Sequence, residues 1–305
     1  MAQQDKIGWI GLGEMGVEMA SNLHKYLQAN NQQPLTVWNR SPEKAIRLAN
    51  EGATVANSIE DLFLRTNVIF TSLSNDAAVE YVYGILLRLA SKRQDSITFV
   101  ETSTIYPTLP QRLQTELAAF PQHAFLQCPI FGRPPAAAAA QLVWIASGDA
   151  NAIEHLTPYF KSMSRAILDL HTTDVSRASA FKLLGNFWVV GSIELLAEGL
   201  ALGGKNQLAQ ADILKLVELL FPSPVWLGYS KLIVDQVENK TGGSVGGPVG
   251  FPVTLGLKDV RHMQQLAQDS GAKLPTADVA YKNLKTVEER GLGDQDWTTL
   301  IKALL

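Results

Sequence analysis

The chain has 305 residues, of which 46% are hydrophobic and 18% charged, and its formal net charge is −3. The length allows two domains with substantial cores, and the charge argues against nucleic acid or an anionic membrane as a partner. The one cysteine, Cys128, excludes an intrachain disulfide and a multi-cysteine metal site. No run approaches the roughly 18 apolar residues of a membrane span. We therefore expect a cytoplasmic enzyme that acts on small molecules and holds no metal, with Cys128 as a buried packing residue.

The strongest motif lies near the beginning of the chain. Residues 7–10 form an apolar run of strand length, Gly11, Gly13 and Gly16 follow in the spacing G-x-G-x-x-G, and residues 35–38 form a second run. In a dinucleotide site the first glycine permits the tight turn, the second lets backbone approach the pyrophosphate, and the third allows close helix packing. The order predicts a dinucleotide-binding βαβ unit; an ordinary glycine turn is the alternative. The predicted cofactor contacts here are Gly11, Leu12, Gly13, Glu14, Met15 and Gly16, with a helix from about Glu14.

The turn after the second strand, Asn39-Arg40-Ser41, bears on the choice of cofactor. An Asp or Glu at this place binds the ribose 2′-hydroxyl of NAD, whereas a cationic side chain accommodates the 2′-phosphate of NADP. Arg40 supplies a planar, fixed charge and Ser41 a hydroxyl, so the turn favours NADP(H) over NAD(H). The alternatives are that Arg40 is a solvated turn residue and that Ser41 caps the helix opened by Pro42.

The next segments alternate between strand and helix. Strands are predicted at residues 68–72 and 97–101, and helices at residues 42–51, 77–89 and 107–119. This alternation predicts an α/β fold, a Rossmann-type doubly wound parallel sheet with ligands beyond the carboxyl ends of its strands. Hydroxyl-rich turns at two of these ends are candidate binding segments, although such turns also cap helices. Their candidate residues are Leu73, Ser74, Ser103 and Thr104.

The pattern of residues 125–149 predicts a strand, a Gly/Pro turn, an alanine-rich stretch and another strand. In the turn, Gly132 lets backbone approach a substrate closely, between Phe131 and Arg133. Arg133 is a candidate for binding an anion. A loop glycine without a ligand and a surface arginine are the alternatives.

The pattern changes after about residue 172. Residues 176–205 lack proline and carry apolar side chains at helical spacing, which predicts one long helix. We predict a Rossmann NADP-binding domain at residues 1–173 and a mainly α-helical substrate and oligomerisation domain at residues 174–305, entered by this helix. Farther along the chain we predict a glycine-rich loop at residues 239–252 and helices at residues 260–270 and 276–290.

Lys182 and Asn186 lie four residues apart in the long helix and therefore project from one face. A lysine in a cleft acts as a proton donor when desolvation or a neighbouring cation depresses its pKa. On spacing alone, a solvated helix lysine is the alternative.

Several motifs in one order resemble the β-hydroxyacid dehydrogenase family, the group of 3-hydroxyisobutyrate dehydrogenase, tartronate semialdehyde reductase and glyoxylate/succinic semialdehyde reductase. The matching segments are GLGEMGVEMASNL, VWNRSPEKA, SLSNDAAV, ETSTI, PIFGRPPAAAAAQLVWIASGD, KLLGN, FPVTLGLKD and GLGDQDW. They run nearly from end to end of the chain. VWNRS and GLGDQDW look most like the glyoxylate/succinic semialdehyde reductases, which prefer NADPH.

The resemblance implies roles for individual residues. Lys182 matches the family's catalytic lysine, the general acid that protonates the carbonyl oxygen as hydride arrives from C4 of the nicotinamide. Asn186 matches an asparagine that helps to hold substrate, and Ser103 and Gly132 match positions that contact the substrate carboxylate. The positions that match cofactor contacts are Thr104 and Lys258.

The chain departs from the family's pattern in the substrate turn. Where the family usually has Ser-Gly-Gly or Ser-Gly-Ser, residues 131–133 are Phe-Gly-Arg, which removes a small hydroxyl and adds an aromatic wall and a cation. Gly185 also replaces the first asparagine of the common K-x-x-N-N. We therefore expect a bulkier, more apolar or differently charged carbonyl substrate than glyoxylate.

Together these observations predict an NADPH-dependent oxidoreductase that reduces a small aldehyde or keto acid reversibly, with Lys182 as general acid or base. Imine reduction or reductive amination is an alternative, because imine reductases share the fold and the GLGxMG and NRS motifs but typically carry Asp or Tyr in place of the lysine. A non-catalytic NADP-binding scaffold is a third interpretation. The resemblance also implies a homodimer or homotetramer.

Overall fold

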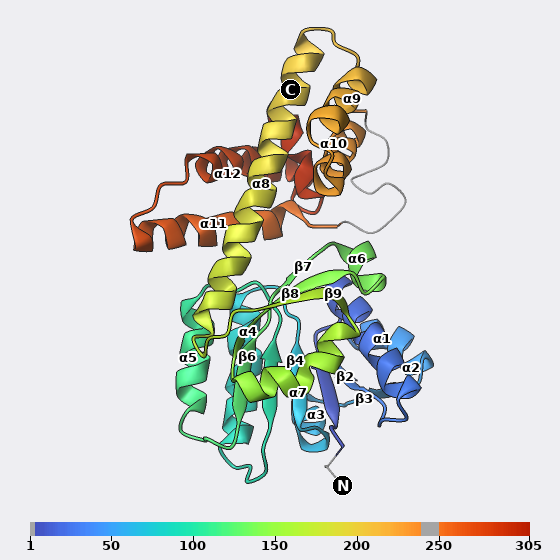
Figure 1. Cartoon of the computed structure of the whole chain (residues 1–305), viewed down its shortest axis with the longest axis vertical. Helices are drawn as coiled ribbons and strands as arrows, with labels where there is room; N and C mark the ends of the chain where they lie inside the picture. Colours follow the sequence, from blue (N-terminus) through green and yellow to red (C-terminus); the bar gives the residue numbers. More distant parts are fainter. Residues whose placement is uncertain (1–3, 239–249) are drawn as a thin grey trace. The chain divides into compact units, whose positions relative to one another are not determined.

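The computed structural model describes residues 4–238 and 250–305, which form two compact units, Met1–Lys182 and Leu183–Leu305 (Figure 1). The division between the units falls inside one long helix, α8 (Ser176–Lys205), whose bounds are those predicted from its apolar spacing. Of the glycine-rich loop predicted at residues 239–252, residues 239–249 lie outside the described part of the chain.

Unit 1 contains the predicted doubly wound sheet. Its strands are β1 (Ile7–Ile10), β2 (Thr36–Trp38), β3 (Thr54–Val55), β4 (Val68–Thr71), β5 (Thr98–Glu101), β6 (Ala124–Gln127), β7 (Ile130–Phe131), β8 (Leu142–Gly148) and β9 (Ser164–Asp169). Within the described residues they form one nine-stranded sheet in the order β3-β2-β1-β4-β5-β6-β8-β7, with β9 paired to β8. The pairs from β3 to β6 are parallel, and β8 runs antiparallel to β6 and β7. The chain therefore reverses its direction of travel across the sheet between β1 and β4.

Helices cover both faces of this sheet because alternate residues of each buried strand point to opposite faces. Trp9 and Phe70 belong to one hydrophobic cluster, and their neighbours Ile10 and Ile69 belong to the other. The helices of the first cluster are α1 (Glu14–Ala29), α2 (Ile46–Asn50), α6 (Pro134–Ala138) and α7 (Ala150–Lys161). Those of the second are α3 (Ile59–Arg65), α4 (Asp76–Ala90) and α5 (Thr108–Leu117).

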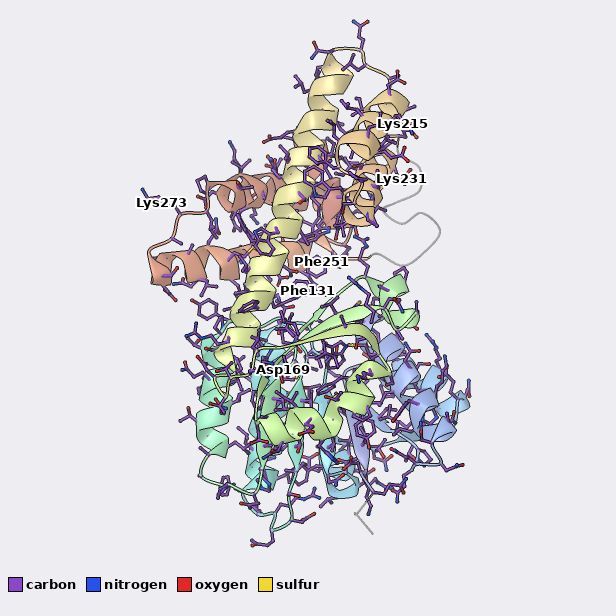
Figure 2. All side chains as sticks on the ribbon, in the orientation of Figure 1. Phe131, Asp169, Lys215, Lys231, Phe251 and Lys273 are labelled. Carbon is purple, nitrogen blue, oxygen red and sulfur yellow. The ribbon has the colours of Figure 1, made fainter. Side chains whose placement is uncertain are left out.

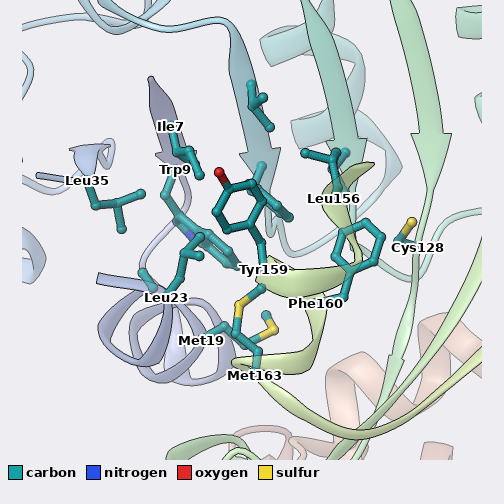
Figure 3. Packing of buried hydrophobic residues seen from close by; sticks show 14 of the residues in the cluster. Ile7, Trp9, Met19, Leu23, Leu35, Cys128, Leu156, Tyr159, Phe160 and Met163 are labelled. Carbon is teal, nitrogen blue, oxygen red and sulfur yellow. The ribbon is translucent and has the colours of Figure 1, made fainter. Parts of the chain in front are cut away.

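Aromatic and aliphatic side chains pack together in the first cluster (Figure 3). Trp9 stacks on Phe70 with ring centroids 5.3 Å apart, and Trp144 stacks on Phe160 at 5.0 Å. Cys128 lies in the same cluster and is fully buried, and this burial raises the pKa of its thiol. Cys128 is therefore a packing residue, as predicted.

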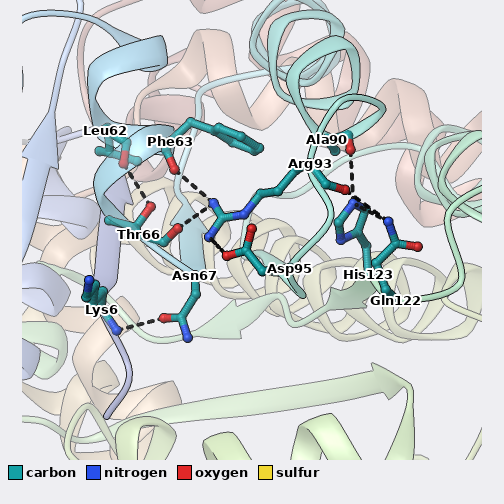
Figure 4. A network of polar contacts seen from close by, with 10 residues as sticks. All are labelled: Lys6, Leu62, Phe63, Thr66, Asn67, Ala90, Arg93, Asp95, Gln122 and His123. Carbon is teal, nitrogen blue, oxygen red and sulfur yellow. Dashed lines mark hydrogen bonds and ion pairs between the residues drawn. The ribbon is translucent and has the colours of Figure 1, made fainter. Parts of the chain in front are cut away.

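Arg93 ties together the loops that precede β4 and β5 (Figure 4). Its Nη1 donates to the carbonyl oxygens of Phe63 at 3.0 Å and Thr66 at 2.7 Å, and its Nη2 pairs with Asp95 at 2.6 Å. The guanidinium also lies 5.2 Å from the centroid of the Phe63 ring. These contacts hold the amino ends of the two strands whose carboxyl ends carry the predicted binding turns.

Unit 2 is helical in the residues described. Its elements are the rest of α8, α9 (Gln210–Leu220), α10 (Pro224–Val237), α11 (Val253–Ser270), α12 (Pro275–Val287), a π-helical turn (Glu288–Leu292) and a 3-10 helix (Trp297–Ala303). The predicted start of α11 at residue 260 is wrong, because Pro252 occupies the N-cap and the helix continues through Lys258 and Asp259. The predicted end of α12 at residue 290 is also late, and Gly291 follows with φ of 79°.

By length and composition alone, α8 could cross a membrane. Core helices of soluble proteins meet the same criterion, and two buried polar side chains of α8, Asn186 and Glu194, have partners within unit 2. Asn186 donates to Asp259 of α11 at 2.6 Å, and Glu194 accepts a hydrogen bond from Asn283 of α12 at 2.6 Å. Such paired buried polar groups are typical of a protein core, so we interpret α8 as a core helix.

Candidate active site

The first and third glycines of the G-x-G-x-x-G turn are required by the fold itself. Gly11 has φ of +99°, and a Cβ there would lie 2.1 Å from the carbonyl oxygen of Ser72. A Cβ on Gly16 would lie 2.2 Å from the carbonyl oxygen of Gly11, so α1 packs directly on the turn. Only glycine satisfies both positions.

Gly13 has no such reason to be glycine. Its φ of −71° is ordinary, and a Cβ there would meet nothing within 4 Å. Gly13 is also the N-cap of α1 and provides no side-chain cap, whereas Ser58 and Asn75 cap α3 and α4. Uncapped N–H groups and the helix dipole favour an anion. The open space and the uncapped helix therefore fit the pyrophosphate of a dinucleotide.

Asn39 holds the glycine turn against the end of β2. Its Oδ1 accepts from the N–H of Leu12 at 2.8 Å, and its Nδ2 donates to the carbonyl oxygen of Ser41 at 2.9 Å. Arg40 is exposed and, within residues 4–238 and 250–305, forms no hydrogen bond or ion pair. Ser41 is the N-cap of a 3-10 helix (Pro42–Ala45), but its side chain makes no capping hydrogen bond. The alternative that Ser41 is the N-cap of a helix opened by Pro42 is thus confirmed for its position, without a capping bond from its hydroxyl.

Glu101 connects the two polar turns, and sequence reasoning did not select it. It is fully buried at the end of β5. Its Oε1 accepts from the N–H of Ser103 at 2.5 Å, and its Oε2 accepts from the hydroxyl of Thr71 at 2.7 Å. The Ser103 hydroxyl bonds to the same carboxylate and accepts from the N–H of Leu73 at 2.7 Å. Glu101 thereby fixes Ser103 and, through it, the turn after β4.

Burial raises the pKa of Glu101 to about 7, because desolvation outweighs the hydrogen bonds from Ser103 and Thr71. Nothing in the sequence signals this, since a glutamate at a strand end is more often exposed. Both donors of Ser103 are engaged with Glu101, so Ser103 orders the turn. Its contact with substrate stays a prediction.

Four further predicted residues lie at the edges of these turns. Glu14 and Met15 open α1, and Glu14 is exposed whereas Met15 packs against the first hydrophobic cluster. Ser74 is exposed, and Thr104 is partly buried. Thr104 does not cap α5, whose N-cap is Pro107. None of these positions conflicts with a cofactor contact.

Lys182, the last residue of unit 1, lies against Phe131. The Lys182 Nζ is 4.1 Å from the centroid of the Phe131 ring (Phe131 is labelled in Figure 2). Lys182 is only 9% exposed, so the alternative of a solvated helix lysine is wrong. Gly132 has φ of +142°, and a Cβ there would lie 2.5 Å from Leu142 Cδ2, so the fold alone requires this glycine. Arg133 follows, partly buried, at the N-cap of α6.

In unit 2 a buried carboxylate organises two predicted residues. Asp259 is fully buried on α11, and its Oδ2 accepts from Nδ2 of Asn186 at 2.6 Å. Its Oδ1 pairs with the ammonium of Lys258 at 3.1 Å. Asp259 was not selected from the sequence, although it stands in the motif segment FPVTLGLKD. Among the described residues, no group of three or more His, Cys, Asp or Glu side chains could hold a metal ion.

Two family models match the chain. The model of the NAD binding domain of 6-phosphogluconate dehydrogenase matches residues 6–173. The model described as NAD-binding of NADP-dependent 3-hydroxyisobutyrate dehydrogenase matches residues 176–304. Each unit of the structure thus carries its own match to a pyridine-nucleotide enzyme.

Known proteins are similar over the full length. The uncharacterized oxidoreductase YfjR of Bacillus subtilis is 34% identical over 98% of this chain and 99% of its own. Glyoxylate/succinic semialdehyde reductase 1 of Arabidopsis thaliana is 25% identical, with 98% of each chain covered. The solved structure of 3-hydroxyisobutyrate dehydrogenase from Mycobacterium tuberculosis superposes with a TM-score of 0.82 at 21% identity, covering 99% of both chains, which shows the fold.

Gly13→Ala should separate nucleotide binding from folding. The added Cβ meets no protein atom within 4 Å, so the unfolding temperature should stay unchanged. The same Cβ should occupy space needed by the pyrophosphate and weaken NADP⁺ binding by about tenfold or more, measured by calorimetry. Gly84→Ala, whose Cβ also meets nothing within 4 Å, is the matched control and should bind normally. Equal affinity of Gly13→Ala and the unaltered chain would show that the pyrophosphate lies elsewhere.

Glu101 should make unfolding depend on pH. Because its pKa is raised from 4.5 to about 7, folded Glu101 keeps a proton that the unfolded chain releases above pH 4.5. The free energy of unfolding should therefore fall as pH rises through this window, by up to about 3 kcal/mol from this group. The side chain in Glu101→Gln stays neutral. The free energy of unfolding of this variant, measured by urea titration at about pH 5 and about pH 7, should therefore fall less between the two pH values than that of the unaltered chain.

The matched control for this pH effect is Glu116→Gln, at an exposed glutamate near the end of α5. It should reproduce the pH dependence of the unaltered chain. If Glu101→Gln also retained the full dependence, the assignment to Glu101 would be wrong.

Proposed function

The chain belongs to the β-hydroxyacid dehydrogenase family of NAD(P)-dependent oxidoreductases, and on that premise we propose that it is an NADPH-dependent reductase of a small aldehyde or keto acid. In the reverse direction the same site oxidises the hydroxyacid. The observation that carries the proposal is Lys182. Its ammonium is buried beside Phe131, in the same unit as the dinucleotide turn.

The reduction divides the chemistry between cofactor and lysine. Bound NADPH supplies a hydride from C4 of the nicotinamide. Lys182 supplies the proton: one Nζ–H bond breaks, an O–H bond forms on the substrate oxygen, and the resulting amine regains a proton from solvent. The ammonium also stabilises the negative charge that develops on that oxygen before the proton moves.

Other residues hold the reactants in this proposal. The turn from Gly11 to Gly16 and the N-terminus of α1 hold the pyrophosphate. Leu73, Ser74, Thr104 and Lys258 contact the rest of the cofactor, and Ser103, Phe131, Gly132 and Arg133 line the substrate site. Asn186, whose amide is oriented by Asp259, helps to hold substrate.

Two observations support the substrate class. One full-length relative is named for glyoxylate and succinic semialdehyde. The substrate turn of this chain carries an aromatic ring and a guanidinium, which suit a carbonyl compound with an apolar part and an anionic group. We propose residues 1–173 as the NADP-binding domain and residues 174–305 as the substrate and oligomerisation domain of a cytoplasmic enzyme.

We also propose that the enzyme assembles as a homodimer or homotetramer. Large apolar side chains are exposed along α8, which supports an interface between copies of the chain. They are Phe181, Leu184, Trp188, Leu195 and Leu202.

Arg40 and Ser41 support the choice of NADPH. Arg40 is exposed at the end of β2 without a protein partner in the described residues, and the Ser41 hydroxyl makes no capping bond. A guanidinium and a hydroxyl at this end of the strand suit a 2′-phosphate, and an acidic residue that would suit the 2′-hydroxyl of NAD is absent from the turn 39–41.

Lys182→Ala should abolish turnover and spare cofactor binding. Loss of the general acid and its charge should lower kcat by about a hundredfold or more, with NADPH affinity unchanged. The assay is NADPH oxidation with glyoxylate, succinic semialdehyde, tartronate semialdehyde, aromatic aldehydes and cyclic imines. Lys205→Ala, at the other end of the same helix, is the matched control and should keep full activity.

The panel also tests the alternatives. Turnover of imines that does not depend on Lys182 would replace the proposal with imine reduction. Tight NADPH binding without turnover of any substrate would favour a non-catalytic scaffold.

Arg40→Ala should shift cofactor preference. Removing a charge-assisted contact to the 2′-phosphate should raise KM for NADPH by about tenfold or more and leave KM for NADH nearly unchanged. Steady-state kinetics with both cofactors measure the ratio. Arg65→Ala removes an exposed arginine of α3 and should leave the ratio as it is. An unchanged ratio in Arg40→Ala would place the determinant of preference elsewhere.

A further inference from the structure

Every polar group of Ser103 is engaged by the protein itself. Its N–H donates to Glu101 Oε1 at 2.5 Å, and its carbonyl oxygen accepts from Nε2 of Gln127 at 3.2 Å. Its hydroxyl bonds to the Glu101 carboxylate and accepts from the N–H of Leu73 at 2.7 Å. Ser103 follows β5 at the carboxyl edge of the sheet, where ligands bind in this type of fold. While Glu101 is ionised, a ligand there meets a hydroxyl whose hydrogen already belongs to the carboxylate.

The buried carboxyl group of Glu101 is surrounded by neutral donors. Within residues 4–238 and 250–305 it forms no ion pair. Its side-chain and backbone partners are the N–H and hydroxyl of Ser103 and the hydroxyl of Thr71. These donors do not fully replace water, so burial raises the pKa of Glu101 to about 7. The geometry thus holds a carboxyl group that changes charge readily when the charge around it changes.

The titratable groups that act on Glu101 supply no positive charge. They are Tyr83 of α4 and Cys128 after β6, and burial raises the pKa of both, so both are neutral at physiological pH. Asp169 of β9, which acts on Cys128, is an anion. A second negative charge brought to this turn is therefore opposed by Glu101 unless Glu101 binds a proton.

A proton on Glu101 changes what its two hydroxyl partners have to do. A backbone N–H can only donate, whereas a hydroxyl can donate or accept, so one of the two hydroxyls turns to accept from the protonated group. If Thr71 accepts, its own hydrogen has two acceptors in the core, Tyr83 Oη at 3.1 Å and the carbonyl oxygen of Val100 at 3.4 Å. In either case the charge that held the Ser103 hydrogen is gone. That hydrogen becomes available to a ligand.

We propose that Glu101 is a positioning residue that takes up a proton when an anionic substrate binds, so that the Ser103 hydroxyl turns from Glu101 to the anionic group. The inference rests on the proposed function. The proton comes from solvent, and an O–H bond forms on the carboxyl group. The uptake offsets the negative charge that the substrate brings, whereas a neutral carbonyl compound leaves Glu101 as it was.

Calorimetry with a pair that cannot react tests the uptake directly. NADP⁺ and succinic semialdehyde are both in the oxidised form, so they bind without hydride transfer. Titration at about pH 8 in two buffers of different ionisation enthalpy counts the protons taken up. We expect about one proton per substrate bound in the unaltered chain and in Glu116→Gln, and none in Glu101→Gln. Benzaldehyde, which carries no charge, should cause no uptake.

The same coupling should appear in steady-state kinetics. Because the anion requires the protonated form of Glu101, KM for succinic semialdehyde should rise by about tenfold per pH unit above about pH 7.5. Neither KM for benzaldehyde nor KM of Glu101→Gln for succinic semialdehyde should show this rise. Lys182 is present in all these chains, so its titration would affect both alike. Equal pH dependence in the unaltered chain and Glu101→Gln would overturn the proposal.

Infrared difference spectroscopy follows the carboxyl group without any substitution, and it keeps the proposal testable if Glu101→Gln does not fold. Addition of succinic semialdehyde to the NADP⁺ complex at about pH 8 should produce the carbonyl stretch of a protonated carboxyl group. Addition of benzaldehyde should not. Binding of succinic semialdehyde without this band would overturn the proposal.

Failure of this inference can be told from failure of the proposed function. Turnover of succinic semialdehyde that depends on Lys182 but involves no proton uptake would overturn the coupling and leave the reductase assignment in place. Absence of both binding and turnover for every carbonyl compound of the panel would overturn the reductase assignment, and the coupling with it.

Discussion

Unit 1 depends on one close contact, in which the backbone at Gly11 lies against the carbonyl oxygen of Ser72. The order of the strands reverses between β1 and β4, so the turns that follow them are neighbours at the carboxyl edge of the sheet. They pass at a distance that no side chain permits. The indole of Trp9, stacked in the core, donates to the carbonyl oxygen of Gly11 at 2.9 Å and holds the turn from below. Because Gly16 packs on Gly11, the direction in which α1 presents its uncapped N-terminus follows from this one contact.

Buried carboxylates then order the polar residues of each unit. Glu101 engages Ser103 and Thr71 beneath the turns of unit 1, and Asp259 engages Asn186 and Lys258 in unit 2. Burying a carboxylate costs free energy unless hydrogen-bond donors surround it. The buried carboxylate therefore keeps its donors in fixed positions.

The sequence alone predicted those features that depend on local pattern. The spacing G-x-G-x-x-G predicted the turn because Gly11 and Gly16 are required by atoms close in the chain or on the turn after an adjacent strand. Apolar spacing predicted both ends of α8. Pairings between distant residues could not be predicted in this way. Asn186 and Asp259 are separated by 73 positions, and no periodic pattern in the sequence indicates that Asp259 accepts a hydrogen bond from Asn186. Burial of Glu101 depends likewise on strands and helices on both sides of it. The boundary at residues 173/174, the roles of Lys182 and Arg40, and the assembly of the chain stay predictions.

The three glycines of the turn are therefore under different kinds of selection. A side chain at Gly11 or Gly16 would clash with backbone atoms, so selection for folding keeps both glycines in every descendant of this chain, whatever its function. A Cβ on Gly13 would meet no protein atom within 4 Å, so in our proposal it is the bound nucleotide that keeps this position glycine. In a lineage that abandoned its cofactor, the first and third glycines would persist while the second drifted. The middle glycine of the motif, rather than the motif as a whole, is thus the position at which a working member of such a lineage can be told from a relic.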